Sequence, residues 1–401
     1  MGSFVRELSK DVKIYKESKV FKGYTLFAPC FSNYVWLIDM NGKVCHYWQM
    51  KHIPGLHGKL LTSGNLMYLG RGPDAYEELG GCASELIEVD WNGKEIWRLD
   101  DNRLNHDFEV LKNGNILVLR FEDILEEIQK KIKGGLPGTD LDGKRLGVQV
   151  REINRNKEVV WEWNNWEHFD VEKDIECPLS FKMVYGYTNS LDAFPNGDVI
   201  ISVRHMNKVI RISKKTGNIV WKWGHGDLLG HQHDVSVLEN GNILIFDNGL
   251  HRIPTKPEHS KEMSFLESSR AVEVNPDTNE IVWEYKDPMN LIYTHTAGGA
   301  QRLPNGNTLI CEARTGILYE VTYDKEVVWK YESPFICKRP DIWGWTETKL
   351  IFQAHRYGLD YKGLNGKNLD PERFEWIIQE KSDETLKEEK RIKNRLAKAG
   401  Y

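Results

Sequence analysis

Imidazole side chains recur at matching places along this chain. Each lies seven or eight residues before the glycine of a turn such as Asn113-Gly114. The first series, which includes one asparagine, consists of His57, His106, Asn189 and His233. Histidine can act as a nucleophile, an acid, a base or a metal ligand near neutral pH. The recurrence therefore predicts chemistry, provided that the fold gathers these residues.

A second series follows the same turns. Its members lie at or near the seventh residue past the turn glycine, and they are Arg71, Arg120, Arg204, Arg314 and Arg356, with Asn248 in the remaining repeat. Arginine presents a planar fork of donors that suits sulfate, phosphate or carboxylate. If the two series meet, they form a site for an anion.

Short strands in a repeated pattern must position these residues. A Gly-containing turn is followed by a β-branched run that ends in Trp, and a phrase of the type NGNILVL recurs in step with it, six times in all. Such self-similarity is typical of radial β repeats. We predict an all-β fold, a six-bladed β-propeller, in which equivalent positions face one another around a central channel. Inter-blade packing is expected of Trp97, Trp161, Trp221, Trp283 and Trp329.

The pattern also predicts how the chain is organised. We expect an irregular or helical arm over 1–22 and a propeller over 23–364, closed by N-terminal strands that pair with the last repeat. Residues 365–401 are expected to form a helical tail, with its helix over 371–398. Insertions that decorate the binding face are expected at 122–147 (an amphipathic helix and a Gly-rich loop), 164–186 and 250–268.

Composition excludes several classes of partner. The 54 basic residues nearly balance 59 acidic ones, and the absence of a basic tract argues against nucleic acid. No apolar run is long enough to span a membrane, and we read no signal peptide. Six dispersed cysteines without a CxxC motif indicate free thiols and a cytoplasmic protein. We expect a small aromatic or anionic substrate and no cofactor; homo-oligomerisation stays open.

The sequence fits two other chemistries less well. His231-Gln232-His233 places two imidazoles on one face of a strand, where they could chelate zinc. The surrounding arginines argue against a cation, so no metal is predicted. A Ser-His-Asp hydrolase would need a GxSxG turn, which the chain lacks.

Several segments resemble the arylsulfotransferase family, bacterial aryl-sulfate sulfotransferases that need no phosphoadenosine donor. The resemblance runs from about Gly23 to Tyr361. Its most specific segments are GYTLFAP (23–29), NHDFEVLKNGNILVL (105–119), TNSLDAFPNGDVIISVRH (188–205), HQHDVSVLENGNILIFDNG (231–249), SSRAVEVNPDTNEIVWEY (268–285), AGGAQRLPNGNTLI (297–310) and HRYGLDYKGL (355–364). The resemblance implies a six-bladed propeller and sulfuryl transfer through a sulfated histidine.

The resemblance also implies roles for individual residues. The nucleophile falls on His233, a His-Asp element on His106, and a Ser-x-Arg-His element on Arg204. Three positions depart from the family. The doubled histidine before the Asp is reduced to Asn105-His106. A histidine is replaced by Tyr187, which could still donate a proton, and a serine by His295. These departures leave two alternatives open: another anion-directed lyase or hydrolase, or a non-catalytic ligand-binding propeller.

The expected site therefore has two parts. The catalytic residues are His233, His106, Arg204 and Tyr187. The substrate-binding residues are Asn189, His295, His57, Arg71, Arg120, Arg314, Arg356 and Asn248.

Overall fold

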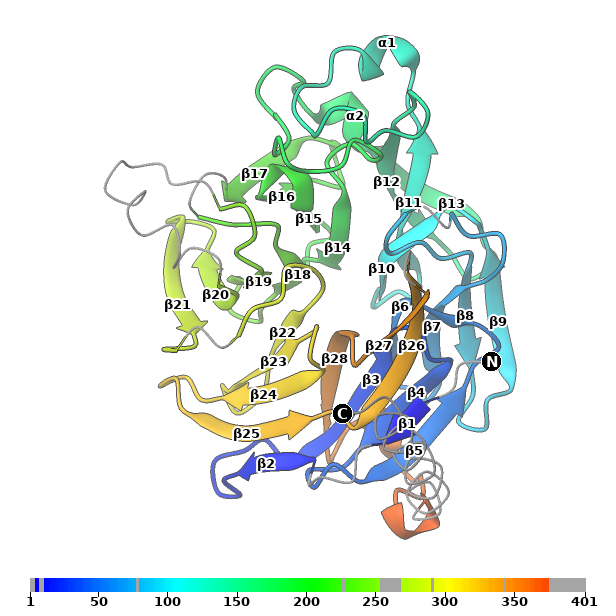
Figure 1. The fold of residues 1–401 in the computed structure, drawn as a ribbon, viewed down its shortest axis with the longest axis vertical. Coiled ribbons are helices and arrows are strands. Elements are labelled where there is room, and N and C mark those ends of the chain that lie inside the picture. Colours follow the sequence, from blue (N-terminus) through cyan, green and yellow to red (C-terminus); the bar gives the residue numbers. More distant parts are fainter. Residues whose placement is uncertain are drawn as a thin grey trace, which may run out of the picture.

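Six antiparallel sheets surround a common axis as the blades of a β-propeller (Figure 1). The structure, a computed structural model, describes residues 4–6, 11–76, 79–224, 228–252, 268–289, 292–341 and 344–374. Within these ranges every blade has at least four strands, and the first strand of each blade lies nearest the axis. The predicted all-β, six-bladed fold is confirmed.

Blades 1 to 3 hold the first half of the ring. From the axis outward, blade 1 consists of β28 (Ile351–Gly358), β3 (Gly23–Pro29), β4 (Tyr34–Ile38) and β5 (Val44–Gln49). Blade 2 consists of β6 (Ile53–Leu60), β7 (Leu66–Arg71), β8 (Glu85–Val89) and β9 (Glu95–Asp100). Blade 3 consists of β10 (Leu104–Val110), β11 (Ile116–Asp123), β12 (Leu146–Ile153) and β13 (Val159–Asn164).

Blades 4 to 6 complete the ring. Blade 4 consists of β14 (Thr188–Ala193), β15 (Val199–Val203), β16 (Lys208–Ile212) and β17 (Ile219–Gly224). Blade 5 consists of β18 (His233–Val237), β19 (Ile243–Asp247), β20 (Arg270–Asn275) and β21 (Glu280–Lys286). Blade 6 consists of β22 (Gly299–Arg302), β23 (Thr308–Glu312), β24 (Ile317–Val321) and β25 (Val327–Glu332), with β2 (Val12–Tyr15) on its outer edge.

Closure of the ring follows from blade 1, which combines both ends of the propeller. The C-terminal strand β28 pairs antiparallel with the N-terminal strand β3, so that His355 lies opposite Leu26. The expected irregular or helical arm differs from the structure at β2. Its residues alternate between half-buried and exposed, and they pair with β25, which would otherwise be a free edge.

The recurrent tryptophans bind each blade to the next. An outer-strand indole N–H donates to a backbone carbonyl in the following blade at 2.8–3.1 Å; the pairs are Trp48 with Asp90, Trp97 with Arg155, Trp163 with Gly217, Trp223 with Asn279, Trp283 with Tyr323, and Trp329 with Met40. The pair from Trp329 to Met40 joins blade 6 to blade 1. In blades 3 and 4 the donor to a backbone carbonyl is the second Trp of the WEW and WKW phrases, while Trp221 donates to the side-chain oxygen of Asn279 in blade 5 at 2.8 Å.

Inner strands carry irregularities that turn side chains toward the axis. The pairing of β10 with β11 shifts register after Asn105, and that of β18 with β19 shifts after His233. His106 has a left-handed backbone, with φ of 48°. Such bulges leave backbone groups unpaired and re-aim side chains. Neighbouring carboxylates take up the freed donors: Asp107 accepts from the Leu191 N–H at 2.9 Å.

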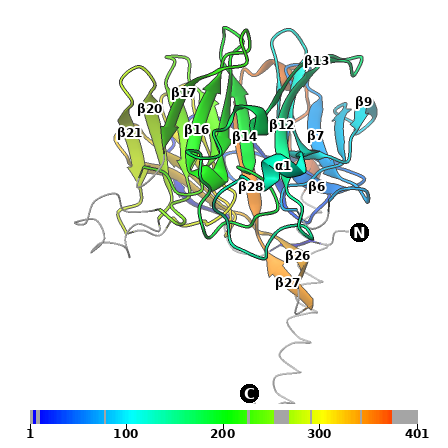
Figure 2. The ribbon, with the colours of Figure 1, turned by 90° about the horizontal axis from the view of Figure 1, so that it is seen from above.

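Insertions and additions lie outside the blades. The amphipathic helix expected in 122–147 is only one turn, α1 (Glu126–Gln129), and α2 (Asn165–His168) is another. Short 3-10 turns occupy Arg204–Met206, Lys362–Leu364 and Pro371–Phe374. Strand β1 (Phe4–Arg6) pairs with β26 (Phe335–Asp341), which pairs with β27 (Gly344–Thr348); β26 and β27 project from one face of the ring (Figure 2).

Two expected segments fall largely outside the described residues. They are the 250–268 insertion, from residue 253 to 267, and the C-terminal helix beyond Phe374. Among the described residues, the search for a long apolar helix that could cross a membrane found none.

Candidate active site in the central cavity

A cavity of about 560 Å³ lies at the centre of the ring, and its lining comes from blades 1 to 5 and from the connection that leads into blade 6. Pockets of this size commonly hold small organic ligands. One part of the lining is apolar and includes Phe31, Ile53, Leu56, Phe181 and Leu350. The other part is basic and aromatic and includes His106, Tyr187, Arg204, His205, His233 and His295. The cavity therefore combines an apolar wall with a cationic, hydrogen-bonding region.

His233 is the first residue of β18, and its imidazole is held in one tautomer. Asn248 donates through its amide nitrogen to the carbonyls of Thr294 and Ala297, at 2.7 and 2.8 Å. Its amide oxygen must therefore face the imidazole, and it accepts from His233 Nδ1 at 2.7 Å. The remaining nitrogen, Nε2, accepts the Ala297 N–H at 3.2 Å. Burial, reinforced by the charge of Arg204, lowers the pKa of His233 well below its usual value. The imidazole is neutral, with its basic nitrogen at Nε2.

His106 is held in the other tautomer, with its proton on Nε2. The amide of Asn105 is oriented by its neighbours. Its oxygen accepts two backbone N–H groups, and its nitrogen donates to His106 Nδ1 at 3.2 Å. The proton of His106 is then on Nε2, which has no hydrogen-bond partner among the described residues. Burial and the charge of Arg204 lower the pKa of His106 to about 3, so this ring is neutral too.

Arg204 differs from Arg120 and Arg356 because its guanidinium pairs with no carboxylate among the described residues. It follows β15 directly, in the 3-10 turn Arg204–Met206, and its side chain is half-buried. In the part of the chain that the structure describes, its side chain makes no hydrogen bond or ion pair. Burial lowers the pKa of Arg204, yet a guanidinium stays charged in proteins. The cavity thus contains a cation whose donors are available to a ligand.

Tyr187 lines the same cavity but is not arranged as an acid. Its hydroxyl donates to the Gly80 carbonyl at 2.7 Å, and burial raises the pKa of the phenol. Its ring stacks on His205 with centroids 4.8 Å apart and meets the His106 ring edge-on at 5.2 Å. Tyr187 therefore fixes the orientation of neighbouring rings.

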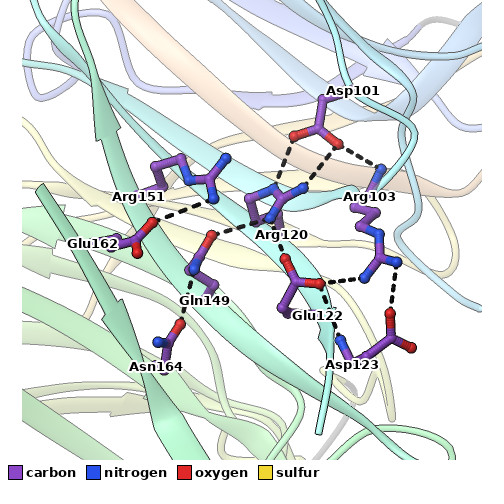
Figure 3. A network of polar contacts seen from close by, with 9 residues as sticks. All are labelled: Asp101, Arg103, Arg120, Glu122, Asp123, Gln149, Arg151, Glu162 and Asn164. Carbon is purple, nitrogen blue, oxygen red and sulfur yellow. Dashed lines mark hydrogen bonds and ion pairs between the residues drawn. The ribbon is translucent and has the colours of Figure 1, made fainter. Parts of the chain in front are cut away.

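Two predicted arginines are held away from the cavity, contrary to the expectation that both series meet at one mouth. Arg120 binds Asp101 at 2.8 Å and Glu122 at 2.6 Å (Figure 3). Arg356 is buried and binds Glu320 at 3.1 Å. The physical reason is strand length. Both lie within long strands, β11 and β28, whose side chains face neighbouring strands and blades, whereas β15 ends one residue before Arg204.

The remaining predicted residues fall into two groups. Arg71 and His295 line the central cavity. His57, Asn189, Asn248 and Arg314 are not part of that lining.

Each residue outside the lining has another environment. His57 is buried against Asp107, 3.0 Å away, and Asn189 donates to the Gln232 carbonyl at 2.9 Å. Asn248 orients His233 instead of facing a ligand. Arg314 is exposed and lines a neighbouring pocket, which shares His295 with the central cavity.

Sequence reasoning missed Phe352 and gave no role to His205. The Phe352 ring lies 5.9 Å from those of His57 and His233 and 6.2 Å from that of His106, so it packs between the imidazoles. It belongs to the degenerate last repeat, where alignment by the turn glycine fails. His205 directly follows Arg204 and lies 3.6 Å from Glu176. Its position directly after Arg204 was the feature of the sequence that could have identified it.

Comparisons with known proteins point to one family. The sequence model of the arylsulfotransferase family matches residues 83–334, well over half of the chain. No curated protein matches. Among solved structures, a protein of unknown function from Bacteroides caccae is 13% identical with a TM-score of 0.51, and the match covers 84% of this chain and 98% of that one. This likeness shows the fold alone.

Two lyases match more weakly. A streptogramin B lyase is 11% identical with a TM-score of 0.44, over 89% of this chain and 98% of that one. Virginiamycin B lyase from Staphylococcus aureus is 13% identical with a TM-score of 0.30, over 58% of this chain and 74% of that one. Neither likeness carries an argument about function.

Proposed function

Because the chain belongs to the arylsulfotransferase family, we propose that it is an enzyme that transfers a sulfuryl group from an aryl sulfate to a phenolic or other hydroxyl acceptor. The reaction passes through a sulfated His233. One observation carries this proposal: the basic Nε2 of His233 and the guanidinium of Arg204, which has no ion-pair partner among the described residues, line one cavity that also has apolar lining residues. An aryl sulfate has the matching parts, an anionic group joined to an aromatic ring.

In the first half-reaction, the lone pair of His233 Nε2 attacks sulfur. The bond between sulfur and the aryl oxygen breaks, and its electron pair leaves on the phenolate. Arg204 and the Nε2–H of His106 supply donors for the sulfuryl oxygens and the departing oxygen. Asn248 accepts the Nδ1–H of the ring, which becomes cationic once sulfated. The Ala297 N–H, which now binds Nε2, must release it before attack.

In the second half-reaction, the acceptor hydroxyl oxygen attacks the same sulfur. The N–S bond breaks, its electron pair returns to Nε2, and the acceptor proton passes to water. Neither His106 nor Tyr187 is arranged to protonate a leaving group: the first is a neutral ring, and the second already donates to Gly80. We therefore expect donors with acidic phenols to react fastest.

Incubation with 4-nitrophenyl sulfate tests this function. Nitrophenolate release should rise with added phenol, and the two substrates should show ping-pong kinetics. His233→Ala should abolish release while the thermal unfolding midpoint shows that the protein still folds. Release that ignores the acceptor would indicate hydrolysis. Release by His233→Ala at the wild-type rate would rule out the covalent route.

A further inference from the structure

A cluster of thiol and imidazole groups lies beside the central cavity and is not used in the proposed reaction. Cys177 comes from the insertion between α2 and β14, His231 precedes β18, and His251 follows β19. One ligand atom from each lies within 4.8 Å of the other two. Three segments far apart in the chain thus bring one sulfur and two nitrogens together.

The distance between Cys177 and His251 fits a tetrahedral zinc ion. Zinc binds sulfur at about 2.3 Å and imidazole nitrogen at about 2.0–2.1 Å, so a tetrahedral angle places sulfur about 3.6 Å from nitrogen. Cys177 Sγ lies 3.6 Å from His251 Nδ1. We propose that Cys177, His231 and His251 bind Zn²⁺, with a fourth position left for water or another ligand.

The environment of His231 supports the proposal independently of that spacing. This residue is 1% exposed, and its Nδ1 has no hydrogen-bond partner among the described residues. A buried nitrogen without a partner is costly, and a metal ion would satisfy it. The other nitrogen, Nε2, lies 3.4 Å from Ser180 Oγ. Metal-binding histidines commonly hold a second polar group in this way.

The local charges also permit a cation. Arg204 is near His231 and opposes a positive ion. Zinc deprotonates a coordinating thiol, so Cys177 would supply one negative charge. Glu176, the neighbouring residue, is buried and already paired with Arg145, so the thiolate of Cys177 is the charge that would offset the metal ion. An ion here would fasten the 164–186 insertion to blade 5, two residues from His233.

Metal content of the full-length protein tests the proposal directly. After chelator treatment, the protein is titrated with ZnCl₂ against a chromophoric competitor, and bound zinc is counted by mass spectrometry. We expect one zinc ion per chain. Cys177→Ser and His251→Ala should each weaken binding by at least about 100-fold, because losing a ligand costs more than losing a group that orients one. Cys45→Ala, which alters another buried cysteine in β5, is the matched control and should bind normally.

Cobalt spectroscopy provides a second readout that needs no variant to fold. Co²⁺ added to the wild-type protein should give a thiolate-to-cobalt charge-transfer band, which excess Zn²⁺ abolishes. Wild-type protein that binds no zinc and shows no such band would overturn the proposal, and so would equal loss of zinc in Cys45→Ala and Cys177→Ser. Neither measurement depends on sulfuryl transfer, so this inference and the proposed function can fail separately.

Discussion

Two arginines from the same repeat series should respond oppositely to the same substitution. Arg204 lines the cavity and has no ion pair among the described residues, whereas Arg120 binds Asp101 and Glu122. Arg204→Gln removes one or two charge-assisted hydrogen bonds to the sulfuryl oxygens, each contributing about 1.5–3 kcal/mol. If two are lost, transition-state stabilisation falls by about 3–6 kcal/mol, and kcat/KM falls by about 10²–10⁴-fold.

The same substitution should leave the fold intact or strengthen it. A half-buried charge without a partner costs desolvation energy, so Arg204→Gln is expected to raise the free energy of unfolding by about 1 kcal/mol. Arg120→Gln leaves Asp101 without its ion pair, while Glu122 keeps the one with Arg103, so we expect a loss of about 1–2 kcal/mol. Its kcat/KM, measured on folded protein, should stay near the wild-type value.

Two assays test these predictions for both variants. Urea unfolding measures stability, and nitrophenolate release with saturating phenol measures activity. The reasoning would be refuted if Arg204→Gln lost as much stability as Arg120→Gln and kept its activity. That outcome would make Arg204 a structural residue. The Arg204→Lys variant adds a further check. It keeps the charge but loses the planar fork, so its kcat/KM should fall between those of the wild type and Arg204→Gln.

Three further predictions concern the tautomer, the ring and acid stability. Asn248→Ala removes the acceptor for His233 Nδ1–H, so kcat/KM should fall about 100-fold with little change in KM for the donor, as steady-state kinetics would show. Trp329→Phe breaks the bond to the Met40 carbonyl, so urea unfolding should report a loss of about 1–2 kcal/mol. Burial lowers the pKa of His46 from 6.5 to about 4. Between these pH values the unfolded chain binds a proton that the folded protein does not, so the free energy of unfolding falls as the pH falls from 6.5 to 4. His46→Gln should therefore reduce the change of the free energy of unfolding with pH by about 1.4 kcal/mol per pH unit over this range. The same change with pH in the variant and the wild type would contradict this.

The fold was largely predictable because its signals are local and repeated. Glycine turns such as Gly114, with φ of 86°, and the buried runs after them recur in register, so six blades follow from counting. The strand β2 was missed because a short alternating segment, VKIY, is indistinguishable from a charged arm until an exposed edge is available to it. In blades 3 and 4, spacing alone did not distinguish Trp163 and Trp223 from the tryptophans two residues earlier.

The site was predictable only in part. The position of a residue in its repeat fixes its height along the propeller axis, but it does not fix the direction of its side chain. His106, Arg204 and His233 line one cavity, as their equivalent positions suggested. Arg120 and Arg356 share the repeat position of Arg204, yet strand pairing continues past them. Arg120 is directed to carboxylates on its own strand and in the connection before blade 3, and Arg356 to a carboxylate of blade 6. Such pairing depends on residues distant in the chain, which a single sequence does not reveal.

The central claim is that His233 carries the sulfuryl group between donor and acceptor. Intact-protein mass spectrometry after incubation with 4-nitrophenyl sulfate, without acceptor, tests it most directly. We predict a gain of one sulfuryl group, mapped to His233 and discharged when phenol is added. A wild-type protein that turns over but never gains this mass, or that gains it on another residue, would contradict the account.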